Sequence, residues 1–191
     1  MPFERFLGYT EQLLNALEYV HQHVPPVLHR SIKPQNVLLG ADGNVALVGL
    51  WPALVPPQPP VARAAGALGS SLQFMPPEQV QGAALDQRSD IYALAATLYF
   101  LSTSVLPPLA GKRINARQRG QLDPLRPVRE LAPHVPSAWR DGLMQALAID
   151  PAQRPPTVGA LRQVLGMAPR PVVPESQVPT LVSGPPPPVA V

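Results

Sequence analysis

The sequence predicts a mainly α fold with one small β-hairpin. Apolar side chains recur at helical spacing near the start of the chain, and residues 89–103 are apolar on every face. Two short apolar runs on either side of an Asp-Gly turn predict the hairpin. With 191 residues, 46% of them hydrophobic and 14% charged, the chain is long enough for one globular domain and hardly for two.

Residues 5–24 are predicted to form an amphipathic helix. Its apolar positions are Leu13, Leu14, Leu17, Val20 and Val24. These positions fall on one face when the chain is helical. The prolines at 25–26 end the helix, because proline lacks an amide hydrogen and fixes φ.

The predicted hairpin follows this helix. The runs "VLL" at 37–39 and "VALVGL" at 45–50 are joined by "GADGN" at 40–44, which contains the Asp-Gly turn signal. Residues 51–74, proline-rich at first, are predicted to be irregular. An irregular segment of that length in a compact domain is usually functional or disordered.

The apolar segment 89–103 predicts a helix buried in the core, because its uninterrupted apolar run is too short to cross a bilayer. Three further helices are predicted at about 111–120, 137–148 and 157–167. Ser137 and Thr157 are the predicted N-caps of the last two, since their hydroxyls can accept from the first free amides. The predicted helices and the hairpin therefore all lie within residues 1–167, which we interpret as one domain.

Residues 168–191 are proline-rich and are predicted to form a disordered tail. The simpler interpretation of this tail is a spacer. The stretch "PRPVVP" at 169–174 also contains a P-x-x-P pattern, which is typical of ligands of polyproline-binding domains. Such a domain is therefore a candidate partner.

Composition excludes several classes of protein. There is no cysteine, so disulfides and thiolate chemistry are excluded, and the four histidines are not spaced as a metal site. The net charge of +3 is too small to indicate nucleic-acid binding. Neither a signal peptide nor a membrane span is visible, which predicts a cytoplasmic protein.

Basic residues gather in one segment, 112–129. It holds six of the 15 basic residues of the chain: Lys112, Arg113, Arg117, Arg119, Arg126 and Arg129. A run of this kind is more often a solvated face than a binding site. The alternative is that it docks an acidic partner.

Five motifs follow one another along the chain. They are "LHRSIKPQNVLL" at 28–39, "GLW" at 49–51, "MPPEQ" at 75–79, "RSDIYAL" at 88–94 and "DPAQRP" at 150–155. In this order and spacing they resemble the larger, helical lobe of a protein kinase, over about residues 3–166. The resemblance is greatest to bacterial serine/threonine kinases of eukaryotic type. It implies a kinase-like C-terminal lobe, with no N-terminal lobe expected because the chain starts at the first helix of the larger lobe.

The resemblance also assigns the catalytic positions. Ser31 stands where the family has the aspartate that accepts or orients the proton of the attacking hydroxyl. Lys33 matches the lysine that neutralises the γ-phosphate, and Asn36 matches the asparagine that holds magnesium. Gly49 replaces the principal magnesium carboxylate. Without the two carboxylates, Lys33 and Asn36 are either functional remnants or structural residues, and no metal site is expected.

Five other motif residues are those that a kinase lobe uses for its own architecture: His29, Arg30, Glu78, Asp90 and Arg154. The resemblance implies that Asp90 holds the backbone of the catalytic loop. It also implies that Glu78 pairs with Arg154. These roles concern folding, not catalysis.

The resemblance therefore leads to a kinase-like protein without catalysis, which acts as a scaffold or binding module for an unidentified protein partner in signalling. ATP and magnesium are expected to be lost as cofactors. One alternative is an atypical or split kinase that phosphorylates protein serine or threonine, and another is a non-functional gene fragment. We also expect the hairpin and the start of the first helix to expose apolar surface that a small lobe would cover.

Overall fold

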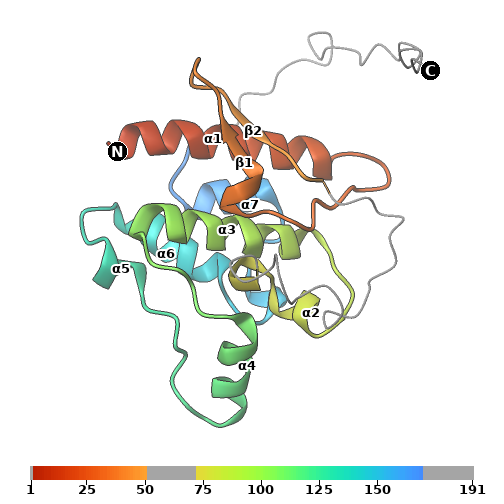
Figure 1. The fold of residues 1–191 in the computed structure, drawn as a ribbon, viewed down its shortest axis with the longest axis vertical. Coiled ribbons are helices and arrows are strands. Elements are labelled where there is room, and N and C mark those ends of the chain that lie inside the picture. Colours follow the sequence, from red (N-terminus) through yellow and green to blue (C-terminus); the bar gives the residue numbers. More distant parts are fainter. Residues whose placement is uncertain (1, 51–71, 170–191) are drawn as a thin grey trace, which may run out of the picture.

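The computed structural model describes residues 2–50 and 72–169 of the chain. Within these ranges the protein is mainly helical, with one two-stranded sheet (Figure 1). The predictions for Trp51, for the proline-rich segment that follows it and for the tail beyond residue 169 lie outside the described residues. The fold class predicted from the sequence is confirmed.

Helix α1 (Phe3–His21) lies along one side of the domain (Figure 1). It buries Phe6, Leu13, Leu14 and Leu17 against the core. The prediction that it runs to residue 24 is wrong, because the helix ends at His21 and leaves Val24 97% exposed. A residue that precedes a proline is disfavoured in the helical region, so the chain leaves the helix before Pro25.

The hairpin packs on α1. Strands β1 (Val37–Leu39) and β2 (Val45–Leu47) pair antiparallel. The side chain of Gln12 on α1 bonds the turn: its Oε1 accepts from Val45 N at 2.8 Å and its Nε2 donates to Gly43 O at 3.3 Å. Apolar residues on and beside the hairpin are exposed, namely Leu38, Leu39, Val48 and Leu50.

The second strand is shorter than predicted, since β2 ends at Leu47 and Gly49 has a φ of +78°. A positive φ takes the chain out of the extended conformation. At the start of the first helix, Phe3 and Leu7 are partly buried against the core. The exposed apolar surface is therefore found at the hairpin, whereas the start of α1 is partly covered.

Helix α3 (Gln87–Thr103) runs through the middle of the domain (Figure 1). All its residues from Ser89 to Tyr99 are buried, so the predicted core helix is confirmed. It begins two residues earlier than predicted because Asp86 caps it. The Asp86 carboxylate accepts from Arg88 N at 2.8 Å, and the Ser89 hydroxyl accepts from Asp86 N at 3.3 Å.

The remaining elements surround α3. They are the short 3-10 turns η1 (Pro34–Asn36), η2 (Leu72–Phe74) and η3 (Pro151–Gln153) and the helices α2 (Pro77–Val80), α4 (Ala110–Gln118), α5 (Val128–Leu131), α6 (Ser137–Ala146) and α7 (Val158–Val164). Thr157 caps α7 as predicted, since its Oγ1 accepts from Ala160 N. The prediction that Ser137 caps α6 is wrong. Pro136 is the N-cap, without a side-chain bond, because its extended backbone places Ser137 already inside the helix.

The core lies between α1, α3, α6 and α7. Trp139 of α6 is 1% exposed and makes edge contacts with Phe3 and Phe6 of α1. Arg162 of α7 is also buried and donates to Glu11 and to Asn15 Oδ1 on α1. The first and last described helices are thus joined directly. None of the described helices combines the length and hydropathy that crossing a bilayer requires.

A buried ion pair fixes α2 to the segment before α7. Arg154 donates to both carboxylate oxygens of Glu78, at 2.7 and 2.9 Å. It also donates to the backbone oxygens of Arg88, Ala148 and Ile149. Glu78 is 6% exposed and Arg154 is 3% exposed, so both charges are removed from water and satisfied by each other.

We expect Glu78→Ala or Arg154→Ala to lower the free energy of unfolding by about 3–5 kcal/mol, because each leaves a buried charge without its partner. The swap of Glu78→Arg with Arg154→Glu should recover part of the loss caused by either single charge reversal. Recovery is partial because the three carbonyl bonds of Arg154 are not restored. Urea denaturation of the single and double variants measures the coupling.

The exposed pair of Arg126 and Glu130, 4.0 Å apart, is the matched control. The same swap there should show coupling below about 0.5 kcal/mol, as is usual for exposed ion pairs. Strictly additive effects at Glu78 and Arg154 would contradict the contact.

Acid should weaken this ion pair. Burial by itself raises the pKa of Glu78, but hydrogen bonds from Arg154 and Ser89 outweigh it and hold the pKa below the ordinary 4.5. The stabilisation is therefore fully present above that value and is lost as the pH falls through the lowered pKa. Glu78→Gln should flatten the acid limb of the stability profile, measured by urea denaturation at successive pH values. A Glu130→Gln control, at an exposed site, should keep the wild-type slope, and an unchanged slope in Glu78→Gln would exclude this role.

Candidate functional site

The segment with the catalytic-loop motif, residues 28–36, lies between α1 and the hairpin and is held by Asp90 of α3. The Asp90 carboxylate accepts from the backbone amide of His29 at 2.7 Å and from that of Arg30 at 2.8 Å. It also bonds Nε2 of His21, at the end of α1, at 2.9 Å. A carboxylate only accepts, so Nε2 of His21 carries the hydrogen. One buried side chain thus joins α1, the loop and α3.

Arg30 has an unusual backbone conformation. Its φ is +62°, in the left-handed region that residues with a Cβ rarely adopt. A residue in this region costs about 1–3 kcal/mol and persists only when its surroundings enforce it. The bond from Arg30 N to Asp90 supplies part of this enforcement. The Arg30 carbonyl in turn accepts from Gln79 Nε2 of α2 at 3.5 Å, so the loop also contacts the segment that carries Glu78.

The imidazole of His29 is buried inside this arrangement, with 1% of the residue exposed. Burial lowers the pKa of His29, because the charged ring loses its hydration. The nearby Asp90 carboxylate opposes the shift and does not cancel it. A ring that favours the neutral form is suited to packing against the loop, consistent with the architectural position that the sequence assigns to it.

Ser31 is bonded only to Asn36 among the described residues. The Asn36 side-chain amide donates to the Ser31 carbonyl at 2.7 Å and to the Ser31 hydroxyl at 3.1 Å. An amide donor cannot remove a proton, so it does not activate the hydroxyl as a nucleophile or a base. The Asn36 side chain therefore closes the loop on itself.

Gly49 lies against the same amide. A Cβ at position 49 would stand 2.7 Å from Asn36 Nδ2 and 2.9 Å from Asn36 Cγ. Val48, the residue before it, donates its amide to the Asn36 carbonyl at 2.9 Å. The end of the hairpin and the catalytic-loop segment are therefore in direct contact at the place where a side chain at position 49 would begin.

This contact bears on whether the site fits magnesium. The amide nitrogen of Asn36 donates to Ser31, and neither Ser31 nor Gly49 offers a carboxylate oxygen. Hard divalent cations prefer several oxygen ligands, with carboxylates among them. Over residues 2–50 and 72–169, no three histidine or acidic side chains come together as a metal site. The described residues do not fit the ion that the motif implies.

The nine predicted site residues thus fall into three groups. His29, Arg30 and Asp90 form the loop anchor. Ser31, Asn36 and Gly49 meet at the degenerate catalytic positions, with Lys33 half-buried just before η1. Glu78 and Arg154 form the ion pair described above, and these two do not share the loop site.

Sequence reasoning missed His21 as a partner of Asp90, because the two are 69 residues apart and no local rule joins them. It also missed the position of Tyr92, whose ring lies under the guanidinium of Arg154 at 4.8 Å and near that of Arg113 at 5.9 Å. Arg113 donates to the Tyr92 hydroxyl at 3.0 Å. Burial raises the pKa of Tyr92, so the phenol stays protonated beside these cations.

Comparison with known proteins agrees with this arrangement. The family model of the protein kinase domain matches residues 4–165. The DNA damage-responsive serine/threonine-protein kinase RqkA of Deinococcus radiodurans is 30% identical over 169 residues, which are 88% of this chain and 25% of that protein. The serine/threonine-protein kinase PknB of Mycolicibacterium smegmatis is 32% identical over 151 residues, which are 77% of this chain and 23% of that protein.

Solved structures show the same fold. The kinase domain of Mycobacterium tuberculosis PknI superposes with a TM-score of 0.62 at 25% identity and covers 87% of this chain and 56% of that one. The apo form of PpkA-294 gives 0.63 at 22% identity, over 85% and 54%. This chain therefore spans about a quarter of the length of these curated relatives and about half of these solved domains. Because the family model matches most of its length, the chain belongs to the protein kinase family and corresponds to part of the kinase domain.

Proposed function

We propose that this chain is a kinase-fold module that binds a protein partner in signalling and does not transfer phosphate. The observation that carries the proposal is the contact between Asn36, Ser31 and Gly49. At the two positions where the family's chemistry needs carboxylates, this chain has the hydroxyl of Ser31 and the hydrogen of Gly49. The side chain of Asn36 lies between them and is hydrogen-bonded to the loop.

Physical chemistry supports this proposal. Phosphoryl transfer depends on positioning and on the neutralisation of charge, with metal ions bridging the phosphate oxygens. Residues that act as a unit in catalysis lose most of the rate together when one of them is missing. With the base and the metal carboxylate both replaced, little of that unit remains, whereas Asp90 and the ion pair of Glu78 and Arg154 still hold the fold.

The second candidate is an atypical or split kinase that phosphorylates protein serine or threonine. Lys33 and Asn36 favour it, since both residue types match the catalytic loop. The relatives named above are serine/threonine kinases about four times longer than the matched part. The two candidates differ in whether ATP binds with magnesium. A cytoplasmic location and a polyproline-binding partner at 169–174 are further predictions for the chain.

We expect magnesium–ATP not to bind at physiological concentrations, because the described residues offer no anionic ligand at the metal positions. Isothermal titration with ATP, in magnesium and in EDTA, measures this. Magnesium-dependent binding in the sub-millimolar range would overturn the proposal in favour of the atypical kinase. ATP binding that is equal with and without the metal would not support catalysis, since the metal carries the charge neutralisation.

The fit between Gly49 and Asn36 can be tested against a second glycine of the hairpin. Gly49 has a φ of +78° and Gly43 a φ of +81°, but a Cβ at Gly43 would meet nothing within 4 Å. Both Gly→Ala changes cost about 1–2 kcal/mol for the left-handed backbone. Gly49→Ala should cost more, because its Cβ also displaces the Asn36 amide. Urea denaturation of Gly49→Ala and Gly43→Ala compares their free energies of unfolding. Equal losses of stability would show that the Asn36 side chain moves aside without a measurable cost.

A further inference from the structure

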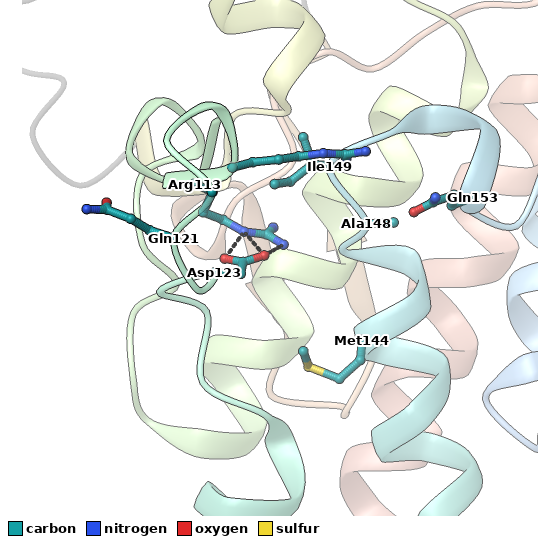
Figure 2. A pocket seen from close by; sticks show the side chains of 9 residues that line it. Arg113, Gln121, Asp123, Met144, Ala148, Ile149 and Gln153 are labelled. Atoms are coloured by element: carbon teal, nitrogen blue, oxygen red, sulfur yellow. Dashed lines mark hydrogen bonds and ion pairs between the residues drawn. The ribbon is translucent and has the colours of Figure 1, made fainter. Parts of the chain in front are cut away.

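A cavity lies away from the catalytic-loop positions, between α4, the loop that follows it and the end of α6. Its volume is about 470 Å³, and Figure 2 shows the side chains that line it. None of its lining residues belongs to segment 28–36 or to the hairpin. The apolar part of the lining consists of Met144, Ala148 and Ile149. A pocket of this volume is large enough for one or two side chains of a partner.

One wall of the pocket carries an ion pair whose two charges neutralise each other. Arg113 is 3% exposed and donates to Asp123 at 2.7–3.2 Å (Figure 2). It also donates to the Tyr92 hydroxyl and to the Leu147 carbonyl. The Asp123 carboxylate also accepts from Leu125 N at 3.0 Å. Burial alone raises the pKa of Asp123, but the bond from Arg113 outweighs it, so Asp123 stays ionised. These two charges therefore cancel each other.

The other polar side chains of the pocket are available to bind a ligand. Arg117 and Gln121 from α4 and its following loop, and Gln153 from η3, line the cavity. In the described part of the chain their side chains make no hydrogen bond or ion pair. The pocket therefore presents the unpaired guanidinium of Arg117 and the amide of Gln153 beside an apolar floor.

The geometry points to a binding site for a carboxylate side chain in an acidic segment of a protein partner. A guanidinium fork matches a carboxylate, the amide of Gln153 can donate beside it, and the floor can hold the methylenes of a glutamate. The amide of Gln121 points outward from the pocket (Figure 2). The charge of the surroundings agrees, since six basic residues lie within 112–129 and Asp123 is their one acidic neighbour in that range. Electrostatic attraction of this kind also speeds encounter.

A carboxylate fits better than a phosphoryl group. Arg117 supplies one uncompensated positive charge, and a phosphoryl group carries about two negative charges at neutral pH. Arg113, the other guanidinium of the lining, is already neutralised by Asp123, so the lining offers no second free cation for the additional negative charge. Of the basic run at 112–129, Arg113 and Arg117 line the pocket, and only Arg117 of these two is without an acidic partner among the described residues. This site is independent of the catalytic-loop positions, so it does not depend on whether phosphate is transferred.

The test is an NMR titration, in which a blocked Leu-Glu-Leu-Glu peptide is added to the whole chain labelled with ¹⁵N. We expect shifts in the amides of 117–121 and 144–153, with no binding of the Leu-Gln-Leu-Gln peptide over the same range. Arg117→Gln should weaken the glutamate peptide about fivefold, as for the loss of one ion pair. Lys112→Gln is the matched control, because it removes the same charge from the same helix at a residue outside the pocket, and it should weaken binding less than about twofold.

Three results would overturn the inference. One is an equal effect of Arg117→Gln and Lys112→Gln, which would indicate general charge attraction. Another is no binding of the glutamate peptide, or shifts confined to other parts of the domain. The third is tighter binding of inorganic phosphate than of the peptide, which would reassign the pocket to phosphoryl groups. Arg117 is exposed, so both variants should keep the wild-type thermal midpoint. The ATP titration tests a different site with a different readout. The proposed function and the carboxylate site can therefore fail independently of each other.

Discussion

The carboxylate of Asp90 holds together the parts of the domain that lie nearest the motif. It is 1% exposed and would be costly to bury alone, but two backbone amides and the His21 ring satisfy it. Through these bonds α1 and segment 28–36 are fixed to the most buried helix of the fold. The left-handed backbone of Arg30 depends on the same bonds. Removing this one side chain would release three elements at once.

The structure separates the parts of a kinase domain that make the fold from those that carry the chemistry. The anchor at Asp90 and the ion pair of Glu78 and Arg154 are complete, with distances between 2.7 and 2.9 Å. Tyr92 adds contacts to the ion pair of Glu78 and Arg154, because its buried ring lies under Arg154 and its hydroxyl accepts from Arg113. At positions 31 and 49 the residue types have changed, and Asn36 fills the space between them. The contacts that hold the fold are therefore kept although the residue types at positions 31 and 49 differ from those of the family.

The sequence predicted the long elements well, because periodicity over α1 and α3 averages over many residues. It missed α2 and α5, which have four residues each and show no period. Helix ends were off by a few residues where a local group decided them, as Asp86 does for α3. The contact of Glu78 with Arg154 followed from the resemblance and not from local rules, since 76 residues separate them.

At the candidate sites, residue types were predictable and contacts were not. Gly49 could be read as a missing carboxylate, but its contact with Asn36 depends on a positive φ that the sequence does not reveal. The basic segment around Arg117 was visible as a charge run. Its pocket also needs Gln153, which is brought to α4 only by the packing of the last helices. Long-range packing is therefore what sequence patterns leave undetermined.

The bonds from Arg162 to α1 have a consequence for synthesis on the ribosome. Glu11 and Asn15 precede Arg162 by 151 and 147 residues, so their partner is made only after nearly the whole domain. Until then α1 lacks α7, and part of its buried face stays open to solvent and to other chains. Contacts of such long separation slow folding, since the loop between them must close first. Until Arg162 has been made, a nascent chain therefore exposes part of the buried face of its first helix, and this is the interval when a chaperone has most to protect.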